Sequence, residues 1–280
     1  MSKHLSVLVE EIIDNLQPYS GGIYLDTTFG GGGHGRAILE VSGPTGRVVG
    51  IDRDPAVKTF ADKLSQEYPG RLEFHTLVYD EIEDLNQKYD GIIADLGMSS
   101  DQLEDEDRGF SFSHDSTLDL RFDSRRGQTA AQFLSQASRD KIAEIFYKFA
   151  QDRHSGSLAT KIVHSRRDHP IKTTQDFVDV VGTSNPKVLA PLFQALRIQV
   201  NDELNILKNG LMAMTNCLKP GGRLAVISFH SLEDAIVKEF FRENPEIQVL
   251  TKKPITSSDE EISKNPRSRS AKLRVGQRLE

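Results

Sequence analysis

The 280-residue sequence contains one cysteine, Cys217, and no tryptophan. A single cysteine excludes a disulfide within the chain and a zinc site built on several cysteines. No apolar run approaches the roughly 20 residues of a membrane-spanning helix, and the N-terminus lacks the apolar core of a signal peptide. We therefore expect a cytoplasmic protein without a membrane partner. His164 and His169 belong to no histidine–carboxylate cluster with metal-ligand spacing, so we expect them at the surface and expect no bound metal.

Charge is unevenly distributed along the chain. The formal net charge of −6 mildly disfavours a nucleic-acid partner for the chain as a whole. Residues 101–107 (DQLEDED) carry five acidic side chains, whereas residues 264–278 carry six basic ones and no acidic one. Two interpretations remain open for the basic segment: a solvated surface, or a contact with a phosphate backbone.

Strand and helix signals alternate over residues 22–97. This alternation predicts an α/β fold, with a parallel sheet and right-handed crossovers. The expected strands are GIYLDTTF (22–29), RVVGID (47–52), RLEFHTL (71–77) and YDGIIADLG (89–97).

The alternation stops after residue 101. Residues 102–199 show only helical patterns, too long a stretch for a loop, and we expect an inserted all-helical subdomain for substrate recognition. The α/β pattern then resumes with a PGG turn at 220–222 and the strand RLAVISF (223–229). Two β-rich segments, 247–255 and 271–279, are expected to close the chain as a hairpin joined by a loop. The main domain is thus expected to be discontinuous, over residues 1–101 and 200–280.

A run of glycines follows the first expected strand. Residues 30–35 (GGGGHG) satisfy the G-x-G-x-x-G pattern between a strand and a helix, which favours a bound nucleoside cofactor. Asp52 ends the next strand, where an acid can hold a ribose hydroxyl. Asp26, at the end of the first strand, favours S-adenosylmethionine over NAD, because a carboxylate suits a cationic sulfur and an ammonium group but repels a pyrophosphate. The sheet expected is therefore a Rossmann-like methyltransferase sheet.

Nine segments along the chain match the motifs of one protein family in the same order. They are HLSVLVEE (4–11), DTTFGGGGHG (26–35), IDRDP (51–55), DLGMSSDQLE (95–104), RGFSF (108–112), LDLRFD (118–123), FQALRIQVNDEL (193–204), SFHSLED (228–234) and NPRSRSAKLR (265–274). With these segments the chain resembles the bacterial ribosomal RNA small subunit methyltransferase H family. The resemblance implies N4-methylation of a cytidine in the decoding region of small-subunit ribosomal RNA, with S-adenosylmethionine as cofactor.

The resemblance also implies which residues hold the cofactor. The backbone at Gly32, Gly33 and His34 would contact its methionine part, and Asp52 its ribose. His34 would lie at the charged end of the cofactor, or would serve as a local cap of the helix. The remaining residues implied are Asp95 at the adenine or the methyl donor, Gln102 from the insertion, and Tyr79 beside the adenine if one residue is inserted.

Methylation of an exocyclic amine needs an acceptor that draws on the N–H group and later takes its proton. Asp95 is the candidate for this role, with Ser99 or Ser100 as hydrogen-bond partners; the alternative is that Asp95 serves only the cofactor. His230 could take the proton or contact the base, or could belong only to the helix that follows. Carbon-5 methylation of cytosine is disfavoured, because Cys217 lies at the wrong end of its expected helix to attack the base.

A base in structured RNA must leave its stack to reach such a site. Aromatic and basic side chains after the cofactor loop could stack on it and bind phosphate, although the phenylalanines could equally seal the joint between the subdomains. The candidate RNA-binding residues are Arg108, Phe110, Phe112 and Arg121, with Arg267, Arg269, Lys272 and Arg274 in the basic segment.

Other functions remain open. They are a methyltransferase of the same fold acting on DNA or a protein amine, and a ribosome-assembly factor that binds RNA and uses the cofactor only as a ligand. A dehydrogenase is disfavoured by Asp26.

Overall fold

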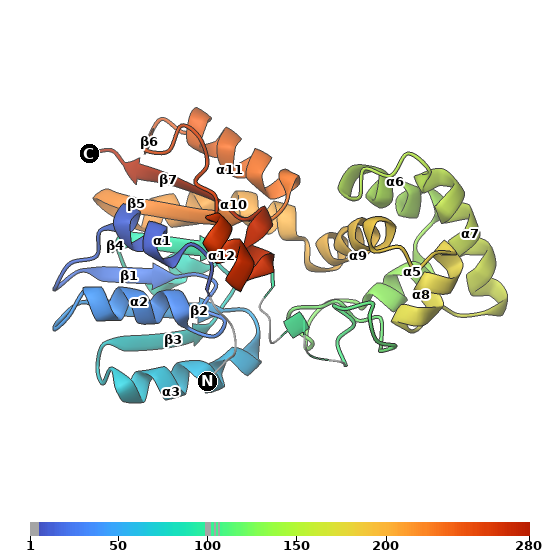
Figure 1. The fold of residues 1–280 in the computed structure, drawn as a ribbon, viewed down its shortest axis with the longest axis horizontal. Helices are drawn as coiled ribbons and strands as arrows, with labels where there is room; N and C mark the ends of the chain where they lie inside the picture. Colours follow the sequence, from blue (N-terminus) through green and yellow to red (C-terminus); the bar gives the residue numbers. More distant parts are fainter. Residues whose placement is uncertain (1–5, 99–101, 104, 106) are drawn as a thin grey trace. The chain divides into compact units, whose positions relative to one another are not determined.

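The computed structural model describes residues 6–98, 102–103, 105 and 107–280. The chain divides into two compact units: Met1–Ser99 with Leu204–Glu280, and Ser100–Glu203. Figure 1 shows the strands gathered in the first unit and helices α5 to α9 in the second. The boundaries expected from the sequence fall within a few residues of these limits.

The first unit is built on a seven-stranded sheet with the order β3-β2-β1-β4-β5-β7-β6 (Figure 1). The strands β1 to β5 run parallel, and β7 runs antiparallel to both β5 and β6. This confirms the predicted Rossmann-like fold class. The strand bounds are β1 Ile23–Asp26, β2 Arg47–Asp52, β3 Leu72–Thr76, β4 Tyr89–Asp95, β5 Leu218–Ser228, β6 Ile247–Val249 and β7 Lys272–Arg278.

Helices cover both faces of the sheet. Successive residues of β4 alternate between two cores: Ile92 packs with the residues of α10 and α11, and Ile93 with those of α1, α2 and α3. Because side chains of a strand point alternately to opposite faces, the part of a central strand that is covered on both sides is apolar, as Ile92, Ile93 and Ala94 are. The helix bounds are α1 Val9–Leu16, α2 Gly33–Val41, α3 Lys58–Glu67, α10 Glu203–Cys217 and α11 Ser231–Glu243.

Two local predictions at the C-terminal end of the chain were wrong. The expected loop between β6 and β7 contains a helix, α12 (Asp259–Lys264), which begins where the Ser258 hydroxyl accepts the N–H of Glu261. The PGG segment lies inside β5, next to an irregularity in its register with β4, rather than forming a turn that precedes the strand.

The second unit is helical, and its helices have strong start signals. Thr129 and Thr173 each form a reciprocal capping box with the third residue of the helix that follows. The rings of Phe146, Phe177 and Phe193 pack in series in its core, with neighbouring ring centres 6.2 and 5.3 Å apart. The helix bounds are α5 Ala130–Gln136, α6 Arg139–Phe149, α7 Ser155–Asp168, α8 Thr174–Val181 and α9 Pro186–Asn201.

Candidate active site

Three acidic residues end neighbouring parallel strands. Asp26 is the last residue of β1, Asp52 of β2 and Asp95 of β4. Because β1 lies between β2 and β4, the three carboxylates share the carboxyl edge of the sheet, where open α/β sheets bind their ligands.

The glycine loop connects β1 to α2 at this edge. Gly32 has a φ of +78°, in the left-handed region that a side chain disfavours, and the helix begins at the next residue. A side chain at Gly33 would come within 2.0 Å of the Ser6 hydroxyl. The backbone conformation thus explains Gly32, and the nearby Ser6 explains Gly33. The N-terminus of α2, with its backbone N–H groups, lies at the same edge of the sheet.

Asp26 is fully buried. Its Oδ1 accepts a hydrogen bond from the Thr28 N–H at 3.3 Å, while its Oδ2 has no hydrogen-bond partner among the described residues. Burial raises the pKa of Asp26 from 3.8 to about 6, although His34 acts against this rise. An ionised carboxylate held in this way favours a cationic ligand.

His34 lies in the first turn of α2 and is 4% exposed. Its Nε2 is 3.4 Å from Oδ2 of Asp95. Burial alone would lower the pKa of His34, but the carboxylates of Asp95 and Asp26 outweigh this effect and raise it. Apart from this contact with Asp95, neither ring nitrogen has a hydrogen-bond partner within the described part of the chain, so His34 does not cap the helix backbone.

Asp52 is half-buried and is fixed by backbone groups. Its Oδ2 accepts the Gly30 N–H and its Oδ1 the Asp54 N–H, both at 2.9 Å. Burial raises the pKa of Asp52 to about 6 in spite of these hydrogen bonds. Asp52 therefore holds the glycine loop against the end of β2, in addition to any contact with a ribose.

Thr28 was not among the residues predicted from the sequence. Its hydroxyl accepts the backbone N–H of Asp95 at 2.6 Å and thereby joins the ends of β1 and β4. In the sequence, the hydroxyl residue two positions after Asp26 was the signal that could have identified Thr28.

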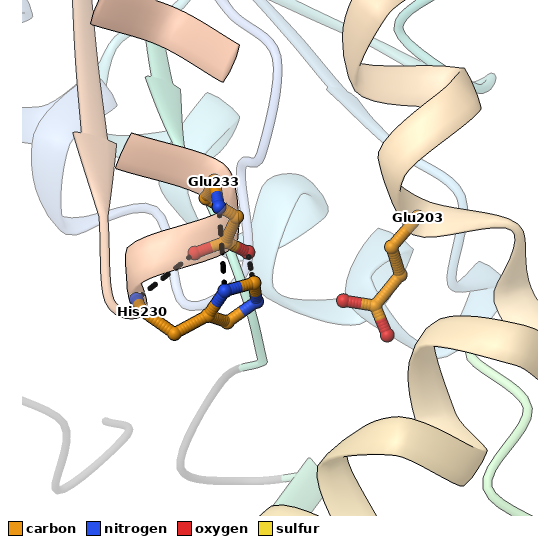
Figure 2. Close-up of side chains that lie close together, drawn as sticks. All are labelled: Glu203, His230 and Glu233. Carbon is orange, nitrogen blue, oxygen red and sulfur yellow. Dashed lines mark hydrogen bonds and ion pairs between the residues drawn. The ribbon is translucent and has the colours of Figure 1, made fainter. Parts of the chain in front are cut away.

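His230 is the N-cap of α11 and forms a capping box with Glu233 (Figure 2). Its Nδ1 accepts the Glu233 N–H at 3.3 Å, and its Nε2 lies 3.2 Å from the Glu233 carboxylate. That carboxylate also accepts the backbone N–H groups of Phe229 and His230. Both ring nitrogens thus face Glu233, an arrangement that supports a capping role over a proton acceptor. Residues 228–234 contain an acid three positions after His230, and this spacing could have identified Glu233.

Figure 2 also draws Glu203. Within the second unit, its carboxylate accepts two hydrogen bonds from the Arg197 guanidinium, at 2.8 and 3.0 Å. This buried fork-shaped pair joins the end of α9 to the residue at which α10 begins.

The remaining predicted site residues are Tyr79, Gln102 and Ser99. The ring of Tyr79 packs against Gly210 of α10, where an added side-chain carbon would come within 2.3 Å of the ring. Gln102 is buried and belongs to the second unit. Ser99 lies outside the described residues.

The predicted RNA-binding residues of the second unit contact one another. Arg108 donates to the carbonyls of Arg121 and Phe122, and Phe110 stacks on Phe122 with ring centres 5.4 Å apart. Phe110 is 6% exposed, so its ring packs within the second unit and is not available to stack on a base. Arg121 pairs through two nitrogens with Asp119. Phe112, half-buried, packs against the ring of Phe193.

The basic segment separates into buried and exposed residues. Arg274 is 7% exposed and donates to Asp234 at 2.7 Å, and Lys272 contacts the other oxygen of Asp234 at 3.2 Å. Although burial opposes the change, these two partners lower the pKa of Asp234. Arg267 and Arg269, in the short helical turn before β7, are exposed. The structure therefore contradicts the expectation that Arg274 presents its guanidinium to RNA.

A sequence model of the MraW methylase family matches residues 1–279. The chain belongs to this family. A relative from Thermomicrobium roseum, "Ribosomal RNA small subunit methyltransferase H", is 42% identical, over 99% of this chain and 94% of its own. A relative of the same name from Nostoc punctiforme is 44% identical, over 99% and 94%. The resemblance inferred from the nine segments is confirmed.

The fold has solved counterparts at low sequence identity. The NSun6 protein of Pyrococcus horikoshii is similar with a TM-score of 0.51 and 11% identity, over 99% of this chain and 53% of that one. This likeness supports the fold. Within the residues that the structure describes, no helix combines the length and the apolar character needed to cross a membrane.

Proposed function

We propose that this protein transfers a methyl group from S-adenosylmethionine to the exocyclic N4 amine of a cytidine in small-subunit ribosomal RNA. The observation that carries the proposal is the pair of carboxylates beside the glycine loop, the buried Asp26 and the half-buried Asp95. Each has an oxygen without a hydrogen-bond partner among the described residues. The names of the relatives supply the class of RNA.

The residues at this edge fit the cofactor. S-adenosylmethionine supplies an electrophilic methyl group on a positively charged sulfur. Asp26 would hold the cationic end of the cofactor, because its ionised form is poorly compensated in the protein alone. Each Asp52 oxygen accepts one backbone N–H group, from Gly30 or from Asp54, and has a further lone pair. With these lone pairs Asp52 would accept hydrogen bonds from the ribose hydroxyls.

Asp95 is the residue that we assign to the acceptor amine. It is the last residue of β4, on the same edge as Asp26, and its Oδ1 has no hydrogen-bond partner within the described residues. A carboxylate that accepts the amine N–H localises the nitrogen lone pair and aligns it with the methyl group. Ser99 remains a proposed partner of the amine. His230 is assigned to α11 instead, because both of its ring nitrogens face Glu233.

RNA contact is assigned to exposed basic residues, Arg267 and Arg269 among them, and to the helical unit. Lys272 is half-buried against Asp234, and its amine remains partly exposed at the start of β7. These cations would bind phosphates, so the affinity for RNA would fall as the salt concentration rises.

Mass spectrometry of small-subunit ribosomal RNA tests the proposal. RNA from cells that lack this protein should lose one methyl group from one cytidine, and purified protein with S-adenosylmethionine should restore it. The Asp95→Asn variant should bind the cofactor within a few-fold of wild type but restore the methyl group far more slowly. An unchanged methylation pattern in the deleted cells would refute the RNA substrate. Equal losses of binding and turnover would make Asp95 a cofactor ligand only.

A further inference from the structure

His34 lies within a group of acids at the carboxyl edge of the sheet. Asp95 of β4 is 3.4 Å from its Nε2, and Asp26 of β1 acts on it through space. From α12, Glu261 adds a weaker negative influence, although its carboxylate also accepts the N–H of Leu8. Together these acids favour the protonated imidazolium in the protein without a ligand.

The segments around His34 contribute further groups. Ser6, which precedes α1, contacts the glycine next to His34, and its hydroxyl carries no charge. At the end of β2, Asp52 acts on Asp26, and its own oxygens accept backbone N–H groups. Among the described residues, the charged groups with the largest effects on His34 are therefore acidic, namely Asp26, Asp95 and Glu261.

As proposed above, Asp26 would hold the cationic end of S-adenosylmethionine, which carries a positive sulfonium. Its product, S-adenosylhomocysteine, has the same ammonium and carboxylate groups but an uncharged sulfur. An imidazolium at His34 and a sulfonium held by Asp26 would repel each other strongly in a poorly solvated site. The thioether of the product causes no such repulsion.

We propose that binding of S-adenosylmethionine expels the proton of His34 and that binding of S-adenosylhomocysteine leaves this proton in place. His34 is then a residue that distinguishes cofactor from product by charge. This inference rests on the proposed function, because it requires that the cofactor bind beside Asp26 and Asp95. It adds that the affinity for the cofactor relative to the product rises with pH.

Calorimetry in two buffers of different ionisation enthalpy counts the protons released on binding. At about pH 7, where Asp26 with a pKa of about 6 is mostly ionised, the wild type should release more protons with S-adenosylmethionine than with S-adenosylhomocysteine. The difference should be at most one proton, that of His34, because any proton change at the ammonium group, which both ligands carry, is the same for both and cancels. In the His34→Gln variant the two ligands should release equal numbers. The His164→Gln variant, changed at an exposed residue of α7, should behave as wild type.

A second measurement covers the case in which His34→Gln binds too weakly. The ratio of the two affinities in the wild type should shift toward S-adenosylmethionine as the pH rises from 6 to 8, by up to about tenfold per pH unit. A flat ratio, or equal proton release with both ligands in the wild type, would overturn the inference. Failure of S-adenosylmethionine to bind at all would instead contradict the proposed function.

Discussion

The Asp52 carboxylate accepts the backbone N–H of Gly30 at 2.9 Å across the carboxyl edge of the sheet. Its other oxygen accepts the N–H of Asp54, so one side chain fixes both the glycine loop and the turn before α3. Sequence spacing suggested only that Asp52 would hold a ribose. The structure adds that it shapes the loop that faces the cofactor.

The Asp52→Ala variant should therefore lose cofactor affinity and stability together. Two backbone N–H groups lose their acceptor, and hydrogen bonds to a charged acceptor contribute about 1.5–3 kcal/mol each. We expect the affinity for S-adenosylmethionine to fall at least about tenfold, with a lower Tm. Calorimetry and thermal unfolding measure the two effects. An Asp52→Asn variant retains one acceptor oxygen, so its affinity and its Tm should lie between those of wild type and Asp52→Ala. Unchanged affinity in Asp52→Ala would remove Asp52 from the site.

Asp26 should destabilise the ligand-free protein at neutral pH. Its pKa rises on folding from 3.8 to about 6, so the folded state binds the proton more tightly than the unfolded state. The free energy of unfolding should therefore fall as the pH rises from about 4 to about 6, by up to about 3 kcal/mol, and stay lower above that range. His34, whose pKa is raised, contributes stability below its unfolded pKa that is lost as the pH rises through its folded pKa.

Urea unfolding of the ligand-free protein at pH 5 and pH 8 measures this dependence. Wild type should be more stable at pH 5. Asp26→Asn should have a smaller difference between the two values and should be the more stable protein at pH 8, while binding S-adenosylmethionine more weakly. Greater stability of wild type at pH 8 than at pH 5 would contradict the destabilising role of Asp26.

His230 provides a test of capping against catalysis. Asparagine is a good N-cap residue, so His230→Asn should keep α11 in place and retain turnover within a few-fold of wild type. His230→Ala should lose about 1 kcal/mol of stability through the missing cap. Thermal unfolding and methyl-transfer rates of both variants separate the roles. A loss of turnover beyond about a hundredfold in His230→Asn at unchanged Tm would identify His230 as a catalytic residue.

Local sequence patterns predicted most of the architecture. Features that depend on contacts between residues distant in sequence could not be predicted from these patterns. The strand β4 was readable because its centre, Ile92, Ile93 and Ala94, is covered on both faces and is therefore a continuous apolar run. The helix α12 was not, because its six residues, DEEISK, are too short to show an apolar period. The acids Asp26, Asp52 and Asp95 could be placed at one edge, since parallel strands end together. The alternative roles of Arg274 could not be decided, because Asp234, which holds it, lies 40 residues away in the sequence.

Arg269 and Arg274 form a matched pair for testing RNA contact. Arg269 is exposed, whereas Arg274 is buried against Asp234. Arg269→Ala should weaken RNA binding and reduce the salt slope by about 1, with little change in Tm. Arg274→Ala should lower the Tm, because removing one partner of a buried ion pair costs about 3–5 kcal/mol. Binding of small-subunit RNA at several salt concentrations, with Tm values for both proteins, makes the comparison. Weaker RNA binding in Arg274→Ala than in Arg269→Ala, with little change in the Tm of Arg274→Ala, would show that Arg274 leaves Asp234 to bind RNA.

The account depends on a cationic nucleoside cofactor at the carboxyl edge of β1 and β4. Calorimetric titration of the purified protein with S-adenosylmethionine and, separately, with NAD tests this most directly. We expect saturable one-site binding of S-adenosylmethionine that Asp26→Ala weakens at least about tenfold, and no binding of NAD, whose pyrophosphate Asp26 and Asp95 would repel. Binding of NAD in place of S-adenosylmethionine would contradict the assignment of the site and the methyl-transfer reaction proposed from it.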